Sequence, residues 1–513
     1  MNAQLSQTAE KPQTDAYYCE VPSQPCAIVM FGASGDLAQR KLLPALYDLA
    51  FHACLAPRFR LVGFARTKMD DAEFRRKSDE SLTKAKAPGA GDKKRTDFLE
   101  HLHYFAGDYN DPEAFQRLAK RLDELDGEGQ LGGNRLFYLA TPPEIYLEII
   151  EQLGKAGLKR PKSGKSWTRV IIEKPFGRDL ASARALNEKV LSVFDESQVY
   201  RIDHYLGKET VQNLLVFRFG NGIFEPLWNR NYIDHVQITA SEALGVERRA
   251  AFYENTGALR DMIQSHVLQL TSLVAMESPA NFDATSVRNE KIKVLQSIRA
   301  FTPDSIWKNV VRGQYGPGQV DGKAVPGYRQ EPGVKPDSAT ESFVAMKLLV
   351  DNWRWSGVPF YLRTGKRLNK AMTEVVIEFK PAPHRVFHGE KPELNCIVLN
   401  IQPDEGISLS FGAKAPGGQM HISPVTMDFQ YRTTFGGVPR DAYSTLINDC
   451  IRGDATLFDR ADSVEAAWAL VDPISQAWES ASAPPFPNYP SGSEGPRASD
   501  DLTGSDGRRW RPL

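Results

Sequence analysis

The segment 201-RIDHYLGKE-209 gathers several ionisable and hydrogen-bonding side chains just after an apolar run. On an extended chain Asp203 and His204 point to opposite faces, so Asp203 needs a different histidine as its partner. His204, Tyr205 and Lys208 offer a ring nitrogen, a phenol and an ammonium, a set suited to clamping an anion. A capped structural corner would show the same spacing, and both interpretations stay open.

A second histidine, His266, lies in the helical pattern 256-TGALRDMIQSHVLQLTSLVAM-276. It shares a stripe with apolar residues, which is also the usual setting of a histidine buried in a core. Asp261 lies five positions earlier, about 140° around an α-helix, so the two side chains are expected to border one pocket without sharing a face. A histidine backed by a carboxylate is a general base suited to taking a proton from an alcohol, and oxidation also needs a hydride acceptor.

A glycine-containing turn follows the strand pattern 26-CAIVMF-31 and leads into a helical pattern. Gly32 and Gly35 allow a tight turn and the close approach of a phosphate to the backbone, and the following helix N-terminus favours a pyrophosphate. The motif is GxxGxxA, not the full GxGxxG, so a strand–turn–helix corner without a ligand is the alternative. Its position at the first strand–helix junction favours a dinucleotide site.

The second strand pattern ends in 63-GFARTK-68, where an NAD site would usually carry Asp or Glu. Arg66 and Lys68 lie where a 2′-phosphate would sit, which favours NADP and leaves NAD as the weaker alternative. Asp70 and Asp71 follow closely and reduce the positive charge. A surface arginine at a strand end is the other interpretation.

The fifth strand pattern ends in 172-IEKPFGRDL-180, again at the edge where open α/β sheets bind ligands. Lys174 precedes Pro175, which favours extended geometry and allows a cis bond. Lys174 could bridge cofactor and substrate, or it could form a salt bridge with Glu173 or with a carboxylate elsewhere in the chain.

Residues 26–203 alternate between short apolar runs and amphipathic helical patterns. The strand patterns cover 26–31, 59–65, 101–108, 135–141, 169–174 and 198–203, and the helical patterns cover 34–50, 70–84, 111–125, 143–156 and 179–195. This alternation predicts a Rossmann-like, doubly wound α/β domain that binds the dinucleotide. A flexible N-terminal tail is expected at 1–25.

The pattern changes after residue 203. Helical patterns at 255–277 and 285–300 precede strand patterns, and helical patterns return near the end; the strands are expected at 341–351, 374–379, 395–401 and 406–411, and the later helices at 440–452 and 460–480. Strands that follow strands predict a larger α+β domain with a mainly antiparallel sheet over 204–485. The Gly- and Pro-rich stretch 312–336 is expected to be a long ordered loop, and 486–513 a C-terminal tail on the surface.

The 513 residues include 41% hydrophobic and 25% charged residues, with a net charge of −1. This composition predicts a globular protein, and it lacks the basic excess that nucleic-acid binding requires. Five sparse cysteines without a CxxC pair indicate a reducing, cytoplasmic setting. The sequence shows no apolar run long enough for a membrane span and no HExxH or other metal-ligand cluster, so no metal is expected.

Six motifs recur here in the order typical of one family: FGASGDLAQRKL, GFAR, EKPFG, RIDHYLGKE, TGALRDMIQSH and YLRTGKRL. Together they resemble the glucose-6-phosphate dehydrogenase family from about residue 26 to near the C-terminus, and RIDHYLGKE is the most specific of them. The resemblance implies oxidation of D-glucose 6-phosphate at C1 to 6-phosphoglucono-1,5-lactone with formation of NADPH, the first step of the oxidative pentose phosphate pathway.

The resemblance also implies roles for individual residues. His266 would be the general base and Asp203 its orienting partner. The substrate side would comprise Lys174, His204, Tyr205, Lys208, Glu242, Asp261, Lys366 and Lys370. The cofactor side would comprise Gly32, Ala33, Ser34, Gly35, Asp36, Leu37, Arg40, Lys41, Arg66, Asp108, Tyr109 and Lys174.

The resemblance further implies a homodimer or homotetramer built on the large sheet of the second domain. Two other functions remain alternatives: a dehydrogenase of another aldose 6-phosphate, and a non-catalytic NADP(H)-binding regulator. The regulator should have lost the base or its partner, whereas His266 and Asp203 are both present.

Overall fold

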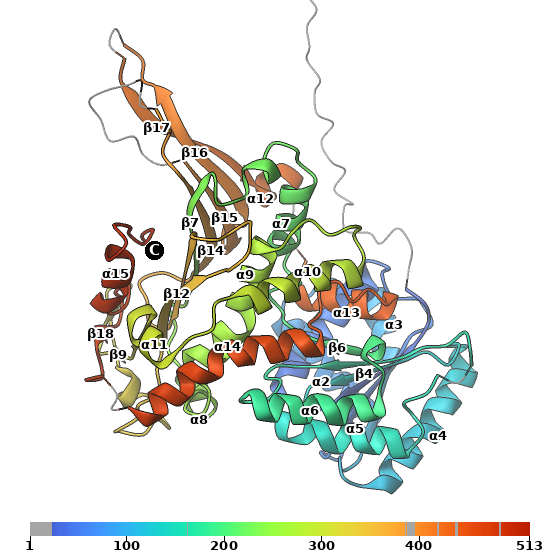
Figure 1. The fold of residues 1–513 in the computed structure, drawn as a ribbon. Coiled ribbons are helices and arrows are strands. Elements are labelled where there is room, and N and C mark those ends of the chain that lie inside the picture. The colour runs from blue at the N-terminus through green and yellow to red at the C-terminus, as the bar shows by residue number, and fades with distance from the viewer. Residues whose placement is uncertain are drawn as a thin grey trace, which may run out of the picture.

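Six short strands between residues 27 and 201 form a parallel sheet in the order β3-β2-β1-β4-β5-β6 (Figure 1). They are β1 (Ala27–Phe31), β2 (Arg60–Ala65), β3 (Leu102–Ala106), β4 (Arg135–Leu139), β5 (Thr168–Ile172) and β6 (Val199–Arg201). The whole of β1 is buried, as its sequence AIVMF predicts for a central strand. The expected doubly wound α/β architecture is confirmed.

This is a computed structural model, and it describes residues 23–513 except 162, 385, 387–394, 418–419, 437–439 and 482–483. The N-terminal tail expected at 1–25 therefore lies almost wholly outside the described residues.

Helices connect these parallel strands and cover the sheet. They are η1 (Ala38–Leu42), α1 (Leu43–Phe51), α2 (Asp71–Lys84), α3 (Lys93–Glu100), α4 (Pro112–Gly129), η2 (Pro143–Ile145), α5 (Tyr146–Lys155), α6 (Leu180–Val193) and η3 (Glu196–Gln198). In α4, Asp111 caps the first turn by accepting the N–H of Glu113, and Leu118 and Leu122 are buried on one face. The short helix α3 was not predicted, because its sequence KKRTDFLE has only two apolar residues.

The second sheet has eight strands in the order β17-β16-β15-β14-β7-β13-β12-β8. They are β7 (Ile233–Ser241), β8 (Val310–Gly313), β12 (Phe343–Leu349), β13 (Pro359–Gly365), β14 (Met372–Phe379), β15 (Cys396–Gln402), β16 (Gly406–Lys414) and β17 (Ile422–Gln430). Only β7 and β13 pair in parallel; the other neighbours in the sheet are antiparallel. The expected mainly antiparallel α+β domain is confirmed.

Four strands of this sheet, β7, β8, β13 and β17, were missing from the prediction. In β7 the reason is clear, because His235, Gln237 and Thr239 are polar residues at alternate positions and yet are buried. Gln237 donates to the carbonyl of Arg509 near the end of the chain, which covers this face. A strand whose polar face is buried by a distant segment has no apolar pattern that would reveal it.

Helices of the second half cover the sheet and reach the first domain. They are α7 (Glu209–Phe219), η4 (Glu225–Leu227), η5 (Glu247–Arg249), α8 (Ala250–Tyr253), η6 (Leu259–Val267), α9 (Leu268–Ala275), α10 (Ala284–Ser297), α11 (Pro303–Asn309), α12 (Tyr431–Phe435), α13 (Ala442–Arg452), α14 (Ala461–Ser480) and α15 (Arg497–Gly504). α13 packs against α1, and α14 packs against η6. α14 also packs against α6 (Figure 1). The two sheets therefore share one continuous core.

The stretch 312–336 and the C-terminal residues have more regular structure than expected. The stretch contains β9 (Tyr315–Gly316), β10 (Gly318–Val320), β11 (Lys323–Val325) and η7 (Tyr328–Gln330), and β18 (Tyr489–Pro490) pairs with β9. Trp510 is buried, and its indole N–H donates to the carbonyl of Ser499 at 2.8 Å. The C-terminal segment is thus packed into the second half of the chain, not loosely draped on it.

The cysteines differ from the expectation at one position. Cys26, Cys396 and Cys450 are free and buried, whereas Cys54 is disulfide-bonded. Among the described helices, none combines the length and apolar character needed to cross a bilayer.

Candidate active site

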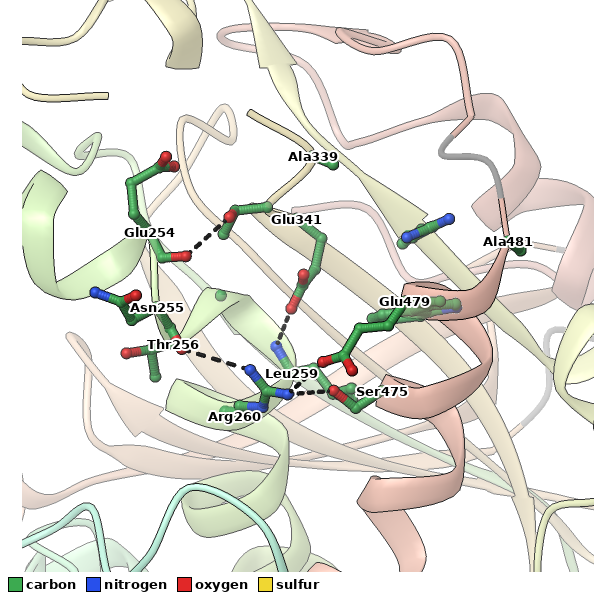
Figure 2. Close-up of a pocket in the computed structure, with 14 residues that line it drawn as sticks. Glu254, Asn255, Thr256, Leu259, Arg260, Ala339, Glu341, Ser475, Glu479 and Ala481 are labelled. Carbon is green, nitrogen blue, oxygen red and sulfur yellow. Dashed lines mark hydrogen bonds and ion pairs between the residues drawn. The ribbon is translucent and has the colours of Figure 1, made fainter. Parts of the chain in front are cut away.

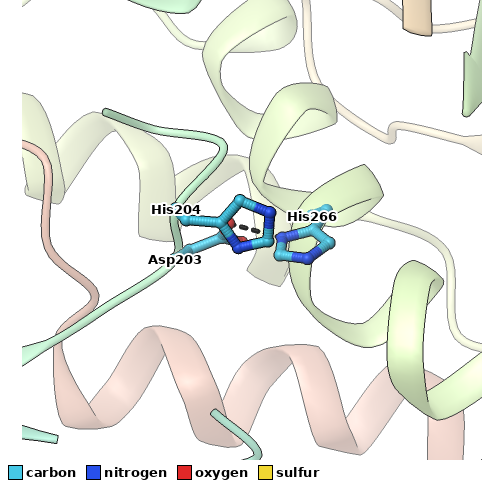
Figure 3. Close-up of side chains that lie close together, drawn as sticks. All are labelled: Asp203, His204 and His266. Carbon is cyan, nitrogen blue, oxygen red and sulfur yellow. Dashed lines mark hydrogen bonds and ion pairs between the residues drawn. The ribbon is translucent and has the colours of Figure 1, made fainter. Parts of the chain in front are cut away.

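Asp203 and His266 meet in the interior, where the chain after β6 passes helix η6 (Figure 3). Nδ1 of His266 donates to Oδ1 of Asp203 at 2.5 Å, and the backbone N–H of Tyr205 donates to the same oxygen at 2.9 Å. The ring of His204 instead lies edge-on to that of His266, with centroids 4.6 Å apart. Asp203 is thus joined to a histidine other than its neighbour in sequence.

Asp261 and His266 lie on the same face of their helix, which corrects the expectation of a 140° separation. Residues Leu259–Val267 form a π-helix, in which hydrogen bonds join residues five apart. Residues with that separation therefore lie about one turn apart. The expectation assumed 3.6 residues per turn, and the apolar spacing carries no signal for the wider turn.

Lys174, which follows β5, links these two side chains. Its ammonium nitrogen lies 2.7 Å from Nε2 of His266, 3.1 Å from Oδ1 of Asp261 and 2.9 Å from the Asp261 carbonyl oxygen. Glu173 forms no ion pair with Lys174; it accepts a hydrogen bond from the Tyr138 hydroxyl at 2.5 Å. The peptide bond between Lys174 and Pro175 is cis.

Burial and neighbouring charges set the protonation of this cluster. Burial alone would raise the pKa of Asp203, but His266 and its hydrogen bond hold that pKa well below the ordinary range. Burial also opposes ionisation of Asp261, yet Lys174 lowers its pKa strongly. Burial lowers the pKa of His266, and the attraction of Asp203 only partly offsets this effect. The cluster therefore consists of two carboxylates, one ammonium and a neutral imidazole whose Nε2 can accept a proton.

The residues expected to clamp an anion lie beside this cluster. The Tyr205 ring stacks on His266 with centroids 4.1 Å apart, and the Lys208 ammonium lies 5.5 Å from the Tyr205 ring centre. Lys208 donates to Oε1 of Gln402 at 2.6 Å. Burial lowers the pKa of His204 well below its usual value, with His266 and Lys174 contributing, so the ring is neutral.

Glu242 and Lys366 come together because they follow two neighbouring parallel strands. Glu242 follows β7 and Lys366 follows β13, and the Lys366 ammonium donates to Oε2 of Glu242 at 2.5 Å. Lys370 is placed differently: its side chain is exposed, and its carbonyl oxygen accepts from the Ser241 hydroxyl at 2.7 Å. Among the described residues, its ammonium has no hydrogen-bond partner.

The turn after β1 has the geometry of a phosphate cradle. Gly32 has a φ of +82°, and a Cβ there would lie 2.4 Å from the Ala140 carbonyl oxygen, so only glycine fits. Ala33 and Leu37 pack toward the core, whereas Ser34 is exposed. A glycine-containing turn beside a helix start can hold a phosphate, and the fit with a dinucleotide is therefore good.

The charged residues around this turn take different positions. Arg66 lies exposed after β2, with its guanidinium 5.6 Å from the centre of the buried Tyr109 ring. Arg40 pairs with Asp36 at 3.1 Å, and Lys41 pairs at 3.3 Å with Asp441, which directly precedes α13. Asp108 is exposed next to Tyr109.

Several residues of the site were not identified from the sequence. Thr373 lies 3.4 Å from the Tyr205 hydroxyl and accepts from Gln402 at 3.1 Å, and the Tyr443 ring lies parallel to that of His204 with centroids 6.1 Å apart. No local pattern marks these residues, because their contacts join parts of the chain far apart in sequence.

Asp203, His204 and His266 also form the one described group whose ligand atoms, all within 4.8 Å, could hold a metal ion. The ammonium of Lys174 lies 2.7 Å from Nε2 of His266. A cation at that nitrogen would be repelled, and the hydrogen bond to Asp203 already occupies the other ring nitrogen. The cluster is better suited to proton transfer than to metal binding.

A separate polar hollow of about 360 Å³ lies at the start of η6 (Figure 2). In this hollow Glu341 accepts a hydrogen bond from the backbone N–H of Leu259 at 3.0 Å. Arg260 donates to Ser475 at 2.5 Å and to Glu479 at 3.1 Å, both on α14. These contacts hold the first turn of η6, and with it Asp261, against the sheet and α14.

Comparison with known proteins agrees with this geometry. Two family models match the chain: the NAD binding domain of glucose-6-phosphate dehydrogenase at residues 29–213, and its C-terminal domain at residues 215–511. Glucose-6-phosphate 1-dehydrogenase from Aggregatibacter actinomycetemcomitans is 48% identical over 95% of this chain and 97% of its own length. The enzyme of the same name from Chlamydia pneumoniae is 47% identical over 95% of this chain and 96% of its own length.

Solved structures show the same similarity. A glucose-6-phosphate dehydrogenase in complex with its substrate glucose 6-phosphate matches with a TM-score of 0.87 and 35% identity, covering 96% of this chain and 100% of that one. The glucose-6-phosphate 1-dehydrogenase from Mycobacterium avium matches with a TM-score of 0.80 and 33% identity, covering 96% and 99%. Since both halves and nearly the whole length match, this chain is an oxidoreductase that belongs to the glucose-6-phosphate dehydrogenase family.

Proposed function

We propose that this chain oxidises D-glucose 6-phosphate at C1 to 6-phosphoglucono-1,5-lactone, with NADP as the hydride acceptor. The observation that carries the proposal is the buried, neutral His266 held between Asp203 and Lys174 at 2.5 and 2.7 Å. When bound, the nicotinamide supplies the acceptor for the hydride that leaves C1.

His266 takes the proton of the C1 hydroxyl at Nε2 as the C1–H bond breaks and the C1–O bond becomes a carbonyl. Asp203 accepts from Nδ1–H and so keeps the lone pair on Nε2. It also stabilises the imidazolium that forms, because a buried carboxylate attracts that charge strongly. Lys174 must move away from Nε2 before the hydroxyl can approach. Its ammonium can then bind the substrate or the cofactor.

The two ends of the sugar phosphate are held by different groups. The phosphate is held by His204, Tyr205 and Lys208, which provide two neutral donors and one cation. The sugar hydroxyls are held by Glu242, Asp261 and Lys366, since carboxylates and an ammonium suit a polyol. Lys370 is a weaker candidate for the substrate side because its side chain is exposed.

On the cofactor side, the backbone from Gly32 to Leu37 holds the pyrophosphate. Arg66 binds the 2′-phosphate, with Ser34 beside it and Tyr109 supporting its guanidinium at 5.6 Å. The proposed cofactor site also includes Arg40, Lys41, Asp108 and Lys174. NAD is expected to bind more weakly because it lacks the 2′-phosphate.

The test measures, with purified protein, the initial rate at which the absorbance of the reduced nicotinamide increases. Glucose 6-phosphate should give turnover with NADP well above that with NAD, and mannose 6-phosphate or galactose 6-phosphate should give far less. If another aldose 6-phosphate were turned over faster, that compound would be assigned as the substrate in place of glucose 6-phosphate. A folded protein that binds NADP but oxidises none of them would instead be a non-catalytic NADP(H)-binding protein.

The proposal also covers assembly, domains and location. We expect a homodimer or homotetramer built on the large sheet, supported by exposed apolar side chains on β17 such as Met427. Residues 26–203 form the NADP-binding domain and 204–485 the substrate and oligomerisation domain. We expect a cytoplasmic location for this first step of the oxidative pentose phosphate pathway; three described cysteines are free thiols, and the disulfide at Cys54 is the observation that argues against it.

A further inference from the structure

A small internal cavity adjoins the Asp203 carboxylate. Its volume is about 30 Å³, and its lining includes Asp203, Arg201, Gln269 and Lys174. A cavity of this size that is partly lined by polar groups has room for one or two water molecules. Its walls come from the carboxyl ends of β5 and β6, from η6 and α9, and from α14.

Three polar atoms of the lining residues are buried without a hydrogen-bond partner among the described residues. They are Oδ2 of Asp203, Oε1 of Gln269 and Nε of Arg201. The rest of Arg201 is already engaged, because its other nitrogens donate to Glu196 at 2.7 Å and to Asn187 at 3.0 Å. Leaving a buried polar atom unpaired is unfavourable, so three such atoms on residues that line one cavity call for a common partner.

The chemistry of the three atoms matches a single water molecule. Asp203 and Gln269 present acceptors, and Arg201 presents a donor. A water molecule has two hydrogens to donate and lone pairs to accept with, so it can satisfy all three. An ion would not suit all three, because a cation would face the Arg201 guanidinium and an anion would face the Asp203 carboxylate.

We propose that a structural water fills this cavity, donating to Oδ2 of Asp203 and Oε1 of Gln269 and accepting from Nε of Arg201, and that Gln269 and Arg201 are thereby positioning residues for the Asp203–His266 pair. Gln269 lies one helical turn beyond His266, in α9. The inference rests on the proposed function, since the pair matters only if His266 is the base.

The water would fix the rotation of the Asp203 carboxylate. Oδ1 already accepts from His266 and from the Tyr205 N–H. With Oδ2 held as well, the carboxylate keeps Oδ1 directed at Nδ1, and Nε2 stays free for the substrate proton. Losing the bridge should slow proton transfer without changing the surfaces that hold the sugar phosphate.

The first test compares Gln269→Leu with Thr271→Val. The leucine variant should lower kcat for glucose 6-phosphate oxidation 10- to 100-fold and leave KM within about twofold. Thr271→Val is the matched control: Thr271 is also buried in α9, but its hydroxyl donates to the Val267 carbonyl and it does not line the cavity. A kcat for Gln269→Leu within twofold of wild type would overturn the proposal.

A second variant separates hydrogen bonding from packing. Gln269→Asn keeps the amide and leaves room for a further water, so it should retain more activity than Gln269→Leu, which is closer in volume. The opposite order would mean that Gln269 acts by filling space.

A crystal structure of the wild-type protein tests the water independently of activity. It should show ordered density within hydrogen-bonding distance of Oδ2 of Asp203 and Oε1 of Gln269. A dry cavity, or a water that does not contact Asp203, would refute the inference whether or not the substrate assignment holds. A wild-type enzyme inactive on glucose 6-phosphate would instead refute the proposed function.

Discussion

The ammonium nitrogen of Lys174 lies 2.7 Å from Nε2 of His266, the nitrogen at which the proposed base would take the substrate proton. This ammonium disfavours protonation of the imidazole and thus contributes to its lowered pKa. It must also move when a hydroxyl takes its place. Lys174 therefore influences both the basicity of His266 and access to it.

Replacing Lys174 by Gln should move the acid limb of the pH profile of kcat/KM to higher pH. In the proposed mechanism His266 works only when neutral, so activity should be lost as the pH falls through its pKa. Burial lowers that pKa first, Asp203 opposes this effect, and Lys174 lowers it further. Without the ammonium the pKa rises, and the variant loses activity at a higher pH than wild type.

The matched control is Lys189→Gln, which removes an exposed lysine paired with Glu151 at 2.8 Å on the first domain. Its pH profile should coincide with that of wild type. An acid limb that stays in place in Lys174→Gln would mean that this ammonium does not tune His266.

Replacing His266 by Asn should lower kcat by roughly 10³-fold or more while the dissociation constant of glucose 6-phosphate changes by only a few-fold. Asparagine keeps a polar side chain near Asp203 but cannot take the proton. Steady-state rates and calorimetric titration measure the two quantities. Turnover within tenfold of wild type would show that another group is the base.

Replacing Arg66 by Ala should raise KM for NADP at least tenfold and change KM for NAD by no more than about twofold. The reason is that only NADP carries the 2′-phosphate that a guanidinium would bind. Arg58→Ala is the control, because Arg58 precedes β2 at the opposite end and donates to Gln130. Equal changes for both cofactors would remove Arg66 from 2′-phosphate recognition.

Replacing Glu173 by Gln should stabilise the protein more at pH 8 than at pH 5.5. Burial raises the pKa of Glu173 to about 7, and the Tyr138 hydrogen bond only partly opposes this rise. The unfolded carboxyl titrates near pH 4.3. The stability that the protonated carboxyl provides is complete below about pH 4.3 and is lost as the pH rises through 7.

The side chain of the glutamine variant cannot ionise. The free energy of unfolding of the variant minus that of wild type should therefore be about 2 kcal/mol larger at pH 8 than at pH 5.5. Urea unfolding at the two pH values measures this difference. Glu144→Gln, at an exposed carboxyl in η2, should show no such dependence. The same advantage at both pH values in Glu173→Gln would contradict the assigned pKa.

The strands of the first domain could be predicted because each has an apolar segment. β1 is wholly buried and wholly apolar, and β4 is wholly buried and apolar after Arg135. In the second domain this rule fails for β7, whose buried polar residues face a segment from the far end of the chain. A hydropathy pattern reveals strands whose buried residues are apolar, and it does not reveal strands whose buried residues are polar.

The site, like the fold, could be predicted only in part. Strand geometry alone excludes His204 as the partner of Asp203, but the choice of His266 came from the family resemblance. The π-helix was not predictable, so the angle between Asp261 and His266 was wrong. The contact between Lys208 and Gln402 joins residues 194 apart, and no spacing rule reaches across that distance.

The packing of α14 on α6 and η6 has a consequence for how the protein is made. The ribosome releases residues 26–203 long before it reaches residue 461. At ordinary elongation rates of about 5–20 residues per second, the side of α6 that contacts α14 remains without that contact for on the order of tens of seconds. The nascent enzyme therefore passes through a stage in which all residues of the dinucleotide domain have been made but α6 still lacks its contacts with α14.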